Sequence, residues 1–198
     1  MFCILPFETE FFRKLNYSVD YVGNPSVDSV AYYKEHQAIP KDTFIKEEGL
    51  ANKPILALLS GSRKQEIKDN LPTMLKVASA YPDYQPVIAG APGIDPAYYQ
   101  EYIGSYPAKI VFGKTYPLLQ HSAAALVTSG TATLETALFR VPQVVCYYVV
   151  AGQLASFIFK HFFHTKYISL VNLIGGREIV QELFGAVSYT HLTLPTIA

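Results

Sequence analysis

Two short polar turns carry the side chains best suited to chemistry in this chain, and each stands between an apolar run and a predicted helix. The first turn is Gly61-Ser62-Arg63. A glycine permits a tight turn, and the first N–H groups of a helix carry a partial positive charge that favours a phosphate. Ser62 can donate a hydroxyl hydrogen bond, and Arg63 can hold two phosphate oxygens at once. The same residues also fit an ordinary capped helix start with a solvated arginine.

The second turn places several hydroxyl groups around another predicted helix start. Its hydroxyl residues and its glycine are Ser129, Gly130, Thr131 and Thr133. These side chains stand beside free backbone donors at the helix start. Glu135 follows on the first turns of the same helix, where a carboxylate can accept two hydrogen bonds from a vicinal diol such as ribose. The alternative is a cap in which Glu135 only complements the helix dipole, but a cap does not need three hydroxyl groups.

Two such turns on one sheet predict a nucleotide diphosphate, with the phosphates at the helix starts and the ribose on Glu135. We expect Arg63 and Glu135 to open onto one shared hollow, and the assignment would lose its physical basis if they opened onto opposite sides of the molecule with no hollow between them. The chain has no Gly-x-Gly-x-x-Gly and no Walker sequence, which argues against dinucleotide cofactors and ATP hydrolysis. Cys3 and Cys146 are far apart and have no metal-ligand spacing. We therefore expect neither a cofactor nor a metal.

The elements that must position these turns follow a regular order between residues 53 and 186. The predicted strands are Ile55–Leu59, Pro86–Ala89, Lys109–Phe112, Ala123–Thr128 and Gln143–Val149. The predicted helices are Lys64–Tyr81, Pro96–Ser105, Tyr116–His121 and Thr131–Phe139. This alternation, with strands that are apolar throughout, is typical of a parallel sheet covered by helices on both faces. We therefore predict an α/β fold with a Rossmann-like parallel sheet, and Pro72 predicts a kink or a restart in the first helix.

The residues outside this domain follow other patterns. Residues 1–30 are predicted to be the remnant of another domain with a crossover. Its elements are the strands Phe2–Leu5 and Tyr17–Val22 and the helix Glu8–Leu15. Residues 31–52 are polar and are predicted to be a linker or a frayed helix. Residues 187–198 continue no earlier pattern, resemble translated sequencing-adapter read-through, and are expected to lie outside the fold.

The composition narrows the range of partners. The 16 basic and 16 acidic residues give a formal net charge of zero, which argues against nucleic acid. Aromatic and basic residues interleave from Gly152 to Asn172, which fits either a helix on a membrane surface or a helix buried against the sheet. His161 and His164 have a spacing compatible with metal ligands, but no acidic residues stand near them. No apolar run is long enough to cross a bilayer.

Several segments resemble the lipid-A-disaccharide synthase family, in the family's order and spacing, from residue 2 to about residue 184. They are Ile4-Leu5-Pro6-Phe7-Glu8 with Tyr21-Val22-Gly23-Asn24-Pro25, the loop Leu59-Ser60-Gly61-Ser62-Arg63-Lys64 with Glu66-Ile67, the turn Ser129 to Glu135, and Tyr167 to Ile174 followed by Gly176 to Leu183. Each motif alone is weak, whereas four together are a specific match.

The resemblance implies a GT-B glycosyltransferase, in which two Rossmann-like domains face each other across a cleft. This chain would supply the C-terminal, UDP-binding domain. The family condenses UDP-2,3-diacylglucosamine with 2,3-diacylglucosamine 1-phosphate, with inversion, to give lipid A disaccharide 1-phosphate and UDP in lipopolysaccharide biosynthesis. The resemblance places the protein in the cytoplasm, peripherally on the inner face of the inner membrane, and it is compatible with a homodimer.

The resemblance also implies roles for individual residues. The donor-nucleotide residues carried over by motif are Gly61, Ser62, Arg63, Ser129, Gly130, Thr131, Thr133 and Glu135. Within that set, Arg63 would meet phosphate or acceptor charge and Glu135 would take the ribose. Asn172 is a polar family position near the reacting centre, with Arg177 and Glu178 in support. Arg63 and Asn172 are therefore the expected catalytic residues.

Some features depart from the family pattern. Asn24 stands where the family usually has His, Ser26 where it has Leu, and Ser60 where it has Pro. We expect the family's N-terminal domain, with its acceptor-side acid, to precede residue 1, so the general base would be absent and the chain inactive alone. Two alternatives stay open: a UDP-sugar 2-epimerase-like enzyme, which would need its own acids and a His in the cleft, and a non-catalytic nucleotide-binding module.

Overall fold

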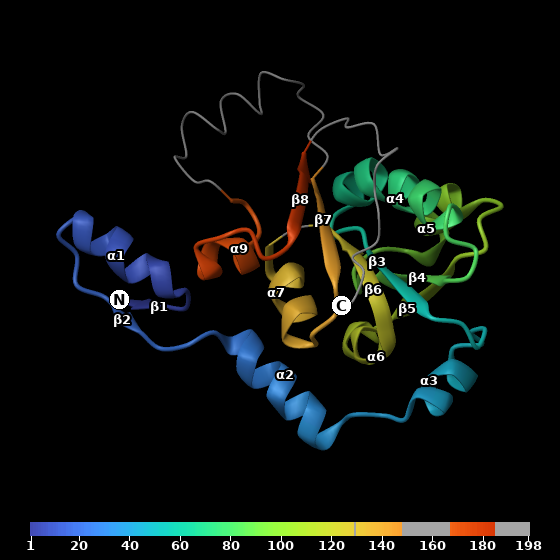
Figure 1. The fold of residues 1–198 in the computed structure, drawn as a ribbon, viewed down its shortest axis with the longest axis horizontal. Helices are drawn as coiled ribbons and strands as arrows, with labels where there is room; N and C mark the ends of the chain where they lie inside the picture. The colour runs from blue at the N-terminus through green and yellow to red at the C-terminus, as the bar shows by residue number, and fades with distance from the viewer. Residues whose placement is uncertain (129, 148–166, 185–198) are drawn as a thin grey trace.

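The computed structural model describes residues 1–128, 130–147 and 167–184, and these residues form a six-stranded parallel sheet at the centre of the molecule (Figure 1). Its strands are β3 (Ile55–Leu59), β4 (Gln85–Gly90), β5 (Lys109–Phe112), β6 (Ser122–Val127), β7 (Gln143–Tyr147) and β8 (Gln181–Phe184). Their order in the sheet is β5-β4-β3-β6-β7-β8, and every neighbouring pair is parallel. The chain therefore builds outward from β3 to one edge, returns to β6, and then builds toward the other edge.

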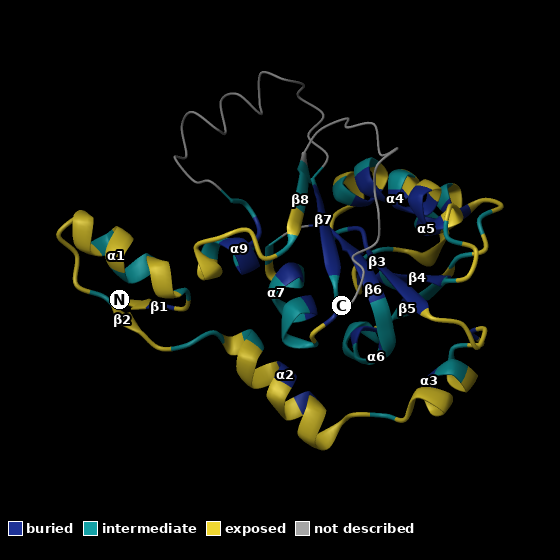
Figure 2. Ribbon diagram, viewed as in Figure 1, coloured by how far each residue is buried: buried dark blue, intermediate teal, exposed yellow. Residues whose placement is uncertain are grey.

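Helices cover both faces of this sheet, as the sequence predicts. They are α3 (Lys41–Glu47), α4 (Lys64–Ser79), α5 (Pro96–Ile103), α6 (Thr115–His121) and α7 (Gly130–Leu138). Alternate residues of a strand point to opposite faces. Leu56 and Leu58 pack in the cluster formed with α4 and α5, whereas Ile55, Ala57 and Leu59 pack in the cluster that includes residues of α3 and α6. Every residue of β3 is buried, which is why this strand reads as apolar throughout (Figure 2).

The core elements agree with the predicted ones to within a few residues, and two differences are informative. Pro72 lies inside α4, which runs without interruption from Lys64 to Ser79. Of the two alternatives, the restart at this proline was therefore wrong, and the kink stays a prediction. The structure also adds a helix and a strand that the periodicity did not predict, α9 (Leu170–Gly175) and β8. Both are short, so neither contains enough residues for a recognisable repeat.

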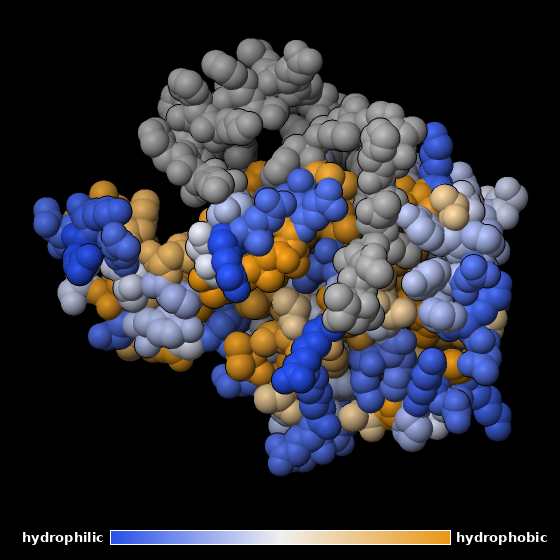
Figure 3. Space-filling model, in the orientation of Figure 1, coloured by the Kyte–Doolittle hydropathy of each residue, from blue (hydrophilic) through white to orange (hydrophobic). Residues whose placement is uncertain are grey.

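The N-terminal residues form a small unit beside the main sheet. Its elements are β1 (Phe2–Cys3), α1 (Pro6–Lys14), β2 (Asp20–Tyr21) and α2 (Pro25–His36), and β1 pairs with β2 in parallel. Most of this unit is exposed (Figure 2). Some of the side chains on its surface are hydrophobic, as the left of Figure 3 shows. The exposed side chains include Phe2, Phe11 and Tyr17. This segment therefore has little core of its own.

The polar region 31–52, which was predicted to be a linker or a frayed helix, is folded against the main sheet. It holds the end of α2 and all of α3. Tyr33 on α2 is buried and donates a hydrogen bond to Gln120 Oε1 at 2.7 Å, and Phe44 on α3 is fully buried in the core. Val30 is buried beside Tyr33 on α2, so a few apolar and aromatic side chains dock these two helices although the surrounding sequence is polar.

Four predictions concern residues outside the part that the structure describes. They are the role of Ser129, residues 152–166 of the helix predicted between Gly152 and Asn172, the pair His161 and His164, and the tail 187–198. In the described part of the chain, no helix combines the length and the apolar character needed to cross a membrane.

Candidate functional site

The two predicted turns leave the sheet side by side. β3 and β6 are neighbours, with Leu59 opposite Val127, and the N–H of Thr128 donates to the carbonyl of Leu59 at 2.8 Å. The order in which the chain adds strands to the sheet reverses here: β4 and β5 lie on one side of β3, and β6, β7 and β8 lie on the other. In open parallel sheets, this reversal point leaves a crevice beyond the carboxyl ends of the strands, where ligands bind. The two turns that the sequence singled out therefore lie together beyond the carboxyl ends of β3 and β6.

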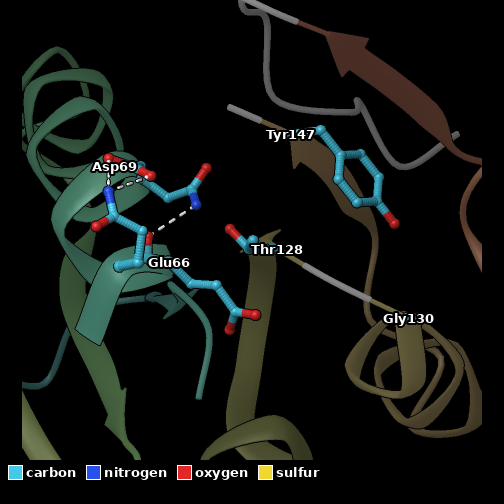
Figure 4. Close-up of a pocket in the computed structure, with 7 residues that line it drawn as sticks. Glu66, Asp69, Thr128, Gly130 and Tyr147 are labelled. Atoms are coloured by element: carbon cyan, nitrogen blue, oxygen red, sulfur yellow. Dashed lines mark hydrogen bonds between the residues drawn. The ribbon is translucent and has the colours of Figure 1, made fainter. Parts of the chain in front are cut away.

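A hollow of about 210 Å³ lies at this reversal point. Its lining residues are Gln65, Glu66, Asp69 and Asn70 from α4, Thr128 and Gly130 from the β6–α7 turn, and Tyr147 from the end of β7. Figure 4 shows Thr128 at the end of its strand, between the acidic residues of α4 on one side and Tyr147 on the other. Of the predicted site residues, Gly130 alone is among the described residues that line this hollow.

The first turn is closed by a carboxylate from its own helix. Gly61 adopts φ +112°, a conformation that favours glycine. Glu66 Oε2 accepts hydrogen bonds from the N–H of Ser62 at 2.8 Å and from the N–H of Arg63 at 3.3 Å. Two donors of this turn, the N–H groups of Ser62 and Arg63, are therefore already occupied by a carboxylate that the chain itself provides.

The side chain of Arg63 is held only loosely by the same carboxylate. Its Nη1 lies 3.4 Å from Glu66 Oε1, and 82% of the side chain is exposed. An exposed ion pair of this kind contributes little to stability. Arg63 can therefore turn toward a charged ligand at low cost.

The hydroxyl groups of the second turn are not equivalent. Thr133 is fully buried and donates to the carbonyl of Gly130 at 2.6 Å, so its hydroxyl stabilises the first turn of α7. Thr131 is exposed at the same helix start. Among the described residues of this turn, Thr131 and Gly130 are the ones open to a ligand.

Glu135 points toward α6. Its Oε1 accepts a hydrogen bond from the Tyr116 hydroxyl at 2.9 Å. Burial, followed by the hydrogen bond to Glu135, raises the pKa of Tyr116 to about 12. Arg63 and Glu135 do not line the hollow, so the single shared hollow that the sequence led us to expect for them is not what the structure shows.

Asn172 lies inside the protein. Its side chain is fully buried, and its Oδ1 accepts the N–H groups of Ile179 at 2.7 Å and Val180 at 3.0 Å. Its Nδ2 donates to the Val180 carbonyl and to Glu182 Oε1, both at 2.8 Å. The amide therefore holds α9 to the segment that leads into β8. This geometry gives Asn172 a positioning role, and a direct contact with substrate stays a prediction.

Sequence reasoning gave no role to Glu182, which is the centre of this network. Its carboxylate accepts the N–H groups of Ile168 and Ser169, the Ser169 hydroxyl at 2.6 Å, and the Asn172 amide. Four donors around one carboxylate, next to the first turn of α9, form a rigid cap. The available signal was an acidic residue on a short strand that ends in Leu183 and Phe184.

Asn70 and Thr128 were also missed from the sequence. Asn70 is 4% exposed and lies on α4 among the core residues Ile67, Leu71 and Met74. A polar residue on the apolar face of an amphipathic helix was the signal that could have identified it. Thr128 is 5% exposed and ends an otherwise apolar strand.

Comparison with protein families and curated sequences gives a consistent result. The family model described as lipid-A-disaccharide synthetase matches residues 1–195, which extends beyond residue 186, the predicted end of the domain. The lipid-A-disaccharide synthase of Solibacter usitatus is 34% identical over 188 residues, and that match covers 92% of this chain and 47% of the relative. The enzyme of Myxococcus xanthus is 36% identical over 195 residues, covering 92% and 48%. The chain therefore spans about half the length of the curated relatives that it matches.

Comparison with solved structures identifies the same fold at low sequence identity. The UDP-GlcNAc 2-epimerase from Methanocaldococcus jannaschii superposes with a TM-score of 0.50 and 14% identity, covering 73% of this chain and 45% of that one. The Neisseria meningitidis UDP-GlcNAc 2-epimerase, bound to UDP-GlcNAc, gives a TM-score of 0.50 and 20% identity, covering 65% and 38%. At these identities the likeness concerns the architecture alone.

Proposed function

The chain belongs to the lipid-A-disaccharide synthetase family, and on that premise we propose that it binds UDP-2,3-diacylglucosamine, the sugar donor of an inverting glycosyl transfer. The proposed acceptor is 2,3-diacylglucosamine 1-phosphate, and the products are lipid A disaccharide 1-phosphate and UDP. One observation supports the proposal above the others. The turns that carry the family's motifs leave adjacent strands at the reversal point of the sheet, where a hollow is lined by the helix that follows the first turn and by Gly130 of the second.

The proposed site holds the diphosphate at the start of α7. Gly130 and Thr131 are open there, and Ser129 precedes them in the chain. Cleavage of the sugar–phosphate bond leaves negative charge on UDP, and donors fixed in advance at that place lower the barrier. Arg63 is exposed enough to reach the same charge from the neighbouring turn. Gly61 and Ser62 shape that turn.

Glu135 is the proposed partner of the ribose hydroxyls. Tyr116 already donates to one of its oxygens, so the carboxylate is held in place before a ligand arrives. A held carboxylate loses little side-chain freedom on binding. Asn172 contributes by fixing α9 against β8 through its four hydrogen bonds.

The transfer also needs a base that removes the proton of the acceptor hydroxyl. We assign no such base to the described residues around the hollow. Since the chain spans about half the length of its relatives, donor binding is the part of the reaction that we propose for its residues. Both proposed substrates carry acyl chains, so we place the reaction in the cytoplasm, at the inner face of the inner membrane.

Calorimetric titration of the 198-residue chain tests the donor-binding proposal. We expect heat on titration with UDP and a Kd in the millimolar range or below, whereas cytidine diphosphate, with the same phosphates and ribose, should bind more weakly. A titration that gives no heat with UDP well above millimolar concentration would argue against the proposal. Equal affinity for UDP and cytidine diphosphate would restrict the donor-binding proposal to recognition of the diphosphate.

A further inference from the structure

Two buried polar atoms at the hollow lack a partner within the described part of the chain. They are Thr128 Oγ1 and Asn70 Oδ1, and both residues are more than nine-tenths buried. The Asn70 amide nitrogen is already used, since it donates to the Glu66 carbonyl at 2.8 Å. Buried polar groups are almost always hydrogen-bonded, so such exceptions in a hollow indicate groups that await a ligand. Both residues line the same hollow.

The direction of the strand explains why these two atoms meet. Ala124 and Leu126 of β6 pack in the cluster on the α4 side of the sheet. Because side chains alternate along a strand, Thr128 continues that row past the strand end and faces α4. Asn70 is buried on the face of α4 that meets the sheet. Packing in the core therefore fixes the positions of Thr128 and Asn70 in the hollow.

The remaining lining residues give the hollow an acidic character. Glu66 and Asp69 contribute carboxylates, and no described residue in the lining is basic. The Gln65 amide donates both to Asp69 Oδ1 at 2.8 Å and to Asp69 Oδ2 at 2.9 Å. A diphosphate placed here would face two like charges, which is unfavourable. A neutral ligand that brings hydroxyl hydrogens would instead find acceptors on Glu66, Asp69, Asn70 and Thr128.

We propose that this hollow receives sugar hydroxyl groups of the nucleotide sugar, recognised by Asn70 Oδ1 and Thr128 Oγ1, while the phosphates remain outside at the start of α7. The inference rests on the proposed function, because it divides one ligand between two neighbouring places. A sugar hydroxyl donates to the Asn70 carbonyl oxygen, and the Thr128 hydroxyl donates to or accepts from another. Gly130 lies at the junction, since it both lines the hollow and begins α7.

The hexose and the ribose both carry such hydroxyls, and two ligands distinguish them. UDP contains the ribose alone, whereas UDP-N-acetylglucosamine contains both sugars. The test is calorimetry of the 198-residue chain with each ligand, for the wild type, Thr128→Val and Asn70→Leu. Thr136→Val is the matched control, because it removes a buried hydroxyl from α7 that bonds the Ala132 carbonyl and does not line the hollow.

We expect Thr128→Val to weaken UDP-N-acetylglucosamine binding roughly five- to tenfold, the effect of one lost neutral hydrogen bond. Loss for this ligand alone assigns the hexose to the hollow, whereas equal loss for UDP assigns the ribose and overturns Glu135 as its partner. The urea midpoint of Thr128→Val should match or exceed the wild type, because the hydroxyl has no partner in the free protein. A purely structural threonine would lower that midpoint instead. Asn70→Leu should weaken the binding of the same ligand whose binding Thr128→Val weakens.

Three results would be decisive against parts of this proposal. Wild-type affinities in both hollow variants, with the wild type binding UDP normally, would overturn the hydroxyl site and leave the proposed function intact. Loss of sugar binding in EDTA with recovery in magnesium would also overturn it, since the acids would then hold a cation. If the wild type binds neither ligand, the proposed function itself fails.

Discussion

The carboxylate of Glu66 lies over the turn that precedes its own helix and accepts the N–H of Ser62 at 2.8 Å. This bond spans four residues and brings the acidic side chain against the backbone of Gly61. The helix start is thereby neutralised from within, which is what a capping acid does. A phosphate that uses the same N–H groups must first displace Glu66, so the second turn, at α7, is the better place for the diphosphate.

The close approach of Glu66 makes Gly61 intolerant of any side chain. A Cβ added to Gly61 would lie 2.5 Å from Glu66 Cβ and 2.6 Å from Glu66 Oε2, and φ is +112°. We predict that Gly61→Ala lowers the free energy of unfolding by about 1–3 kcal/mol, measured by urea denaturation. The control is Gly93→Ala, since a Cβ added to Gly93 would meet no atom within 4 Å and this glycine has no positive φ. Equal stability of the two variants would contradict the described turn.

Tyr116 makes the stability depend on alkaline pH. Its pKa is raised from 10.0 to about 12, first by burial and then by the hydrogen bond to Glu135. The folded protein therefore holds the phenol proton more tightly than the unfolded chain. The resulting stability is fully present below pH 10 and is lost as the pH rises from about 10 to about 12.

Comparison of the wild type with Tyr116→Phe isolates this contribution from the other tyrosines. Because the ring is only partly buried, solvent screening limits the effect to about 1 kcal/mol. We predict that the wild type loses more unfolding free energy than Tyr116→Phe between pH 9 and pH 11.5, in urea titrations at matched ionic strength. Parallel losses in the two proteins would show that neither burial nor the bond to Glu135 raises the pKa of Tyr116 in solution.

The sequence predicted the sheet well because its signals are local. Ile55–Leu59 is a strand in both the prediction and the structure, and α4 begins at Lys64 as expected. An unbroken apolar run between turn residues needs no knowledge of distant contacts. The sequence also predicted that the two turns lie at the same end of the sheet, since the carboxyl ends of parallel strands lie together.

The parts that the sequence did not predict depend on contacts between distant residues. Glu182 and Asn172 are ten positions apart, and their mutual bond gives both residues their role. The direction of Glu135 is set by Tyr116, which is nineteen positions away. Neither orientation follows from periodicity, so the prediction of one hollow shared by Arg63 and Glu135 exceeded what local patterns can support.

Asn172 offers a direct test of positioning against catalysis. Asn172→Ala removes four hydrogen bonds and takes the acceptor away from the N–H groups of Ile179 and Val180. We predict a loss of about 2–4 kcal/mol in unfolding free energy, from urea denaturation, because the deleted amide is fully buried and joins α9 to Glu182. Full stability combined with lost donor binding would instead indicate a direct contact with substrate.

Arg63 is expected to behave in the opposite way, with an effect on ligand affinity and little on stability. Its side chain is 82% exposed, and its pairing with Glu66 at 3.4 Å is solvated. We predict that Arg63→Ala changes the unfolding free energy by less than about 0.5 kcal/mol and weakens UDP binding about tenfold. Calorimetry and urea denaturation on one preparation give both numbers.

A charge-matched control separates a specific contact from a general loss of positive charge. Lys109 is exposed at the start of β5, at the opposite end of the sheet from the two turns, so Lys109→Ala removes the same charge far from the site. Arg63→Lys keeps the charge but loses the planar fork, and it should recover only part of the affinity. The wild-type affinity should also fall more steeply with salt than that of Arg63→Ala, because one charge contact is missing in the variant. If Lys109→Ala weakens UDP binding as much as Arg63→Ala, then Arg63 acts only through the overall field of the protein and has no place at the diphosphate.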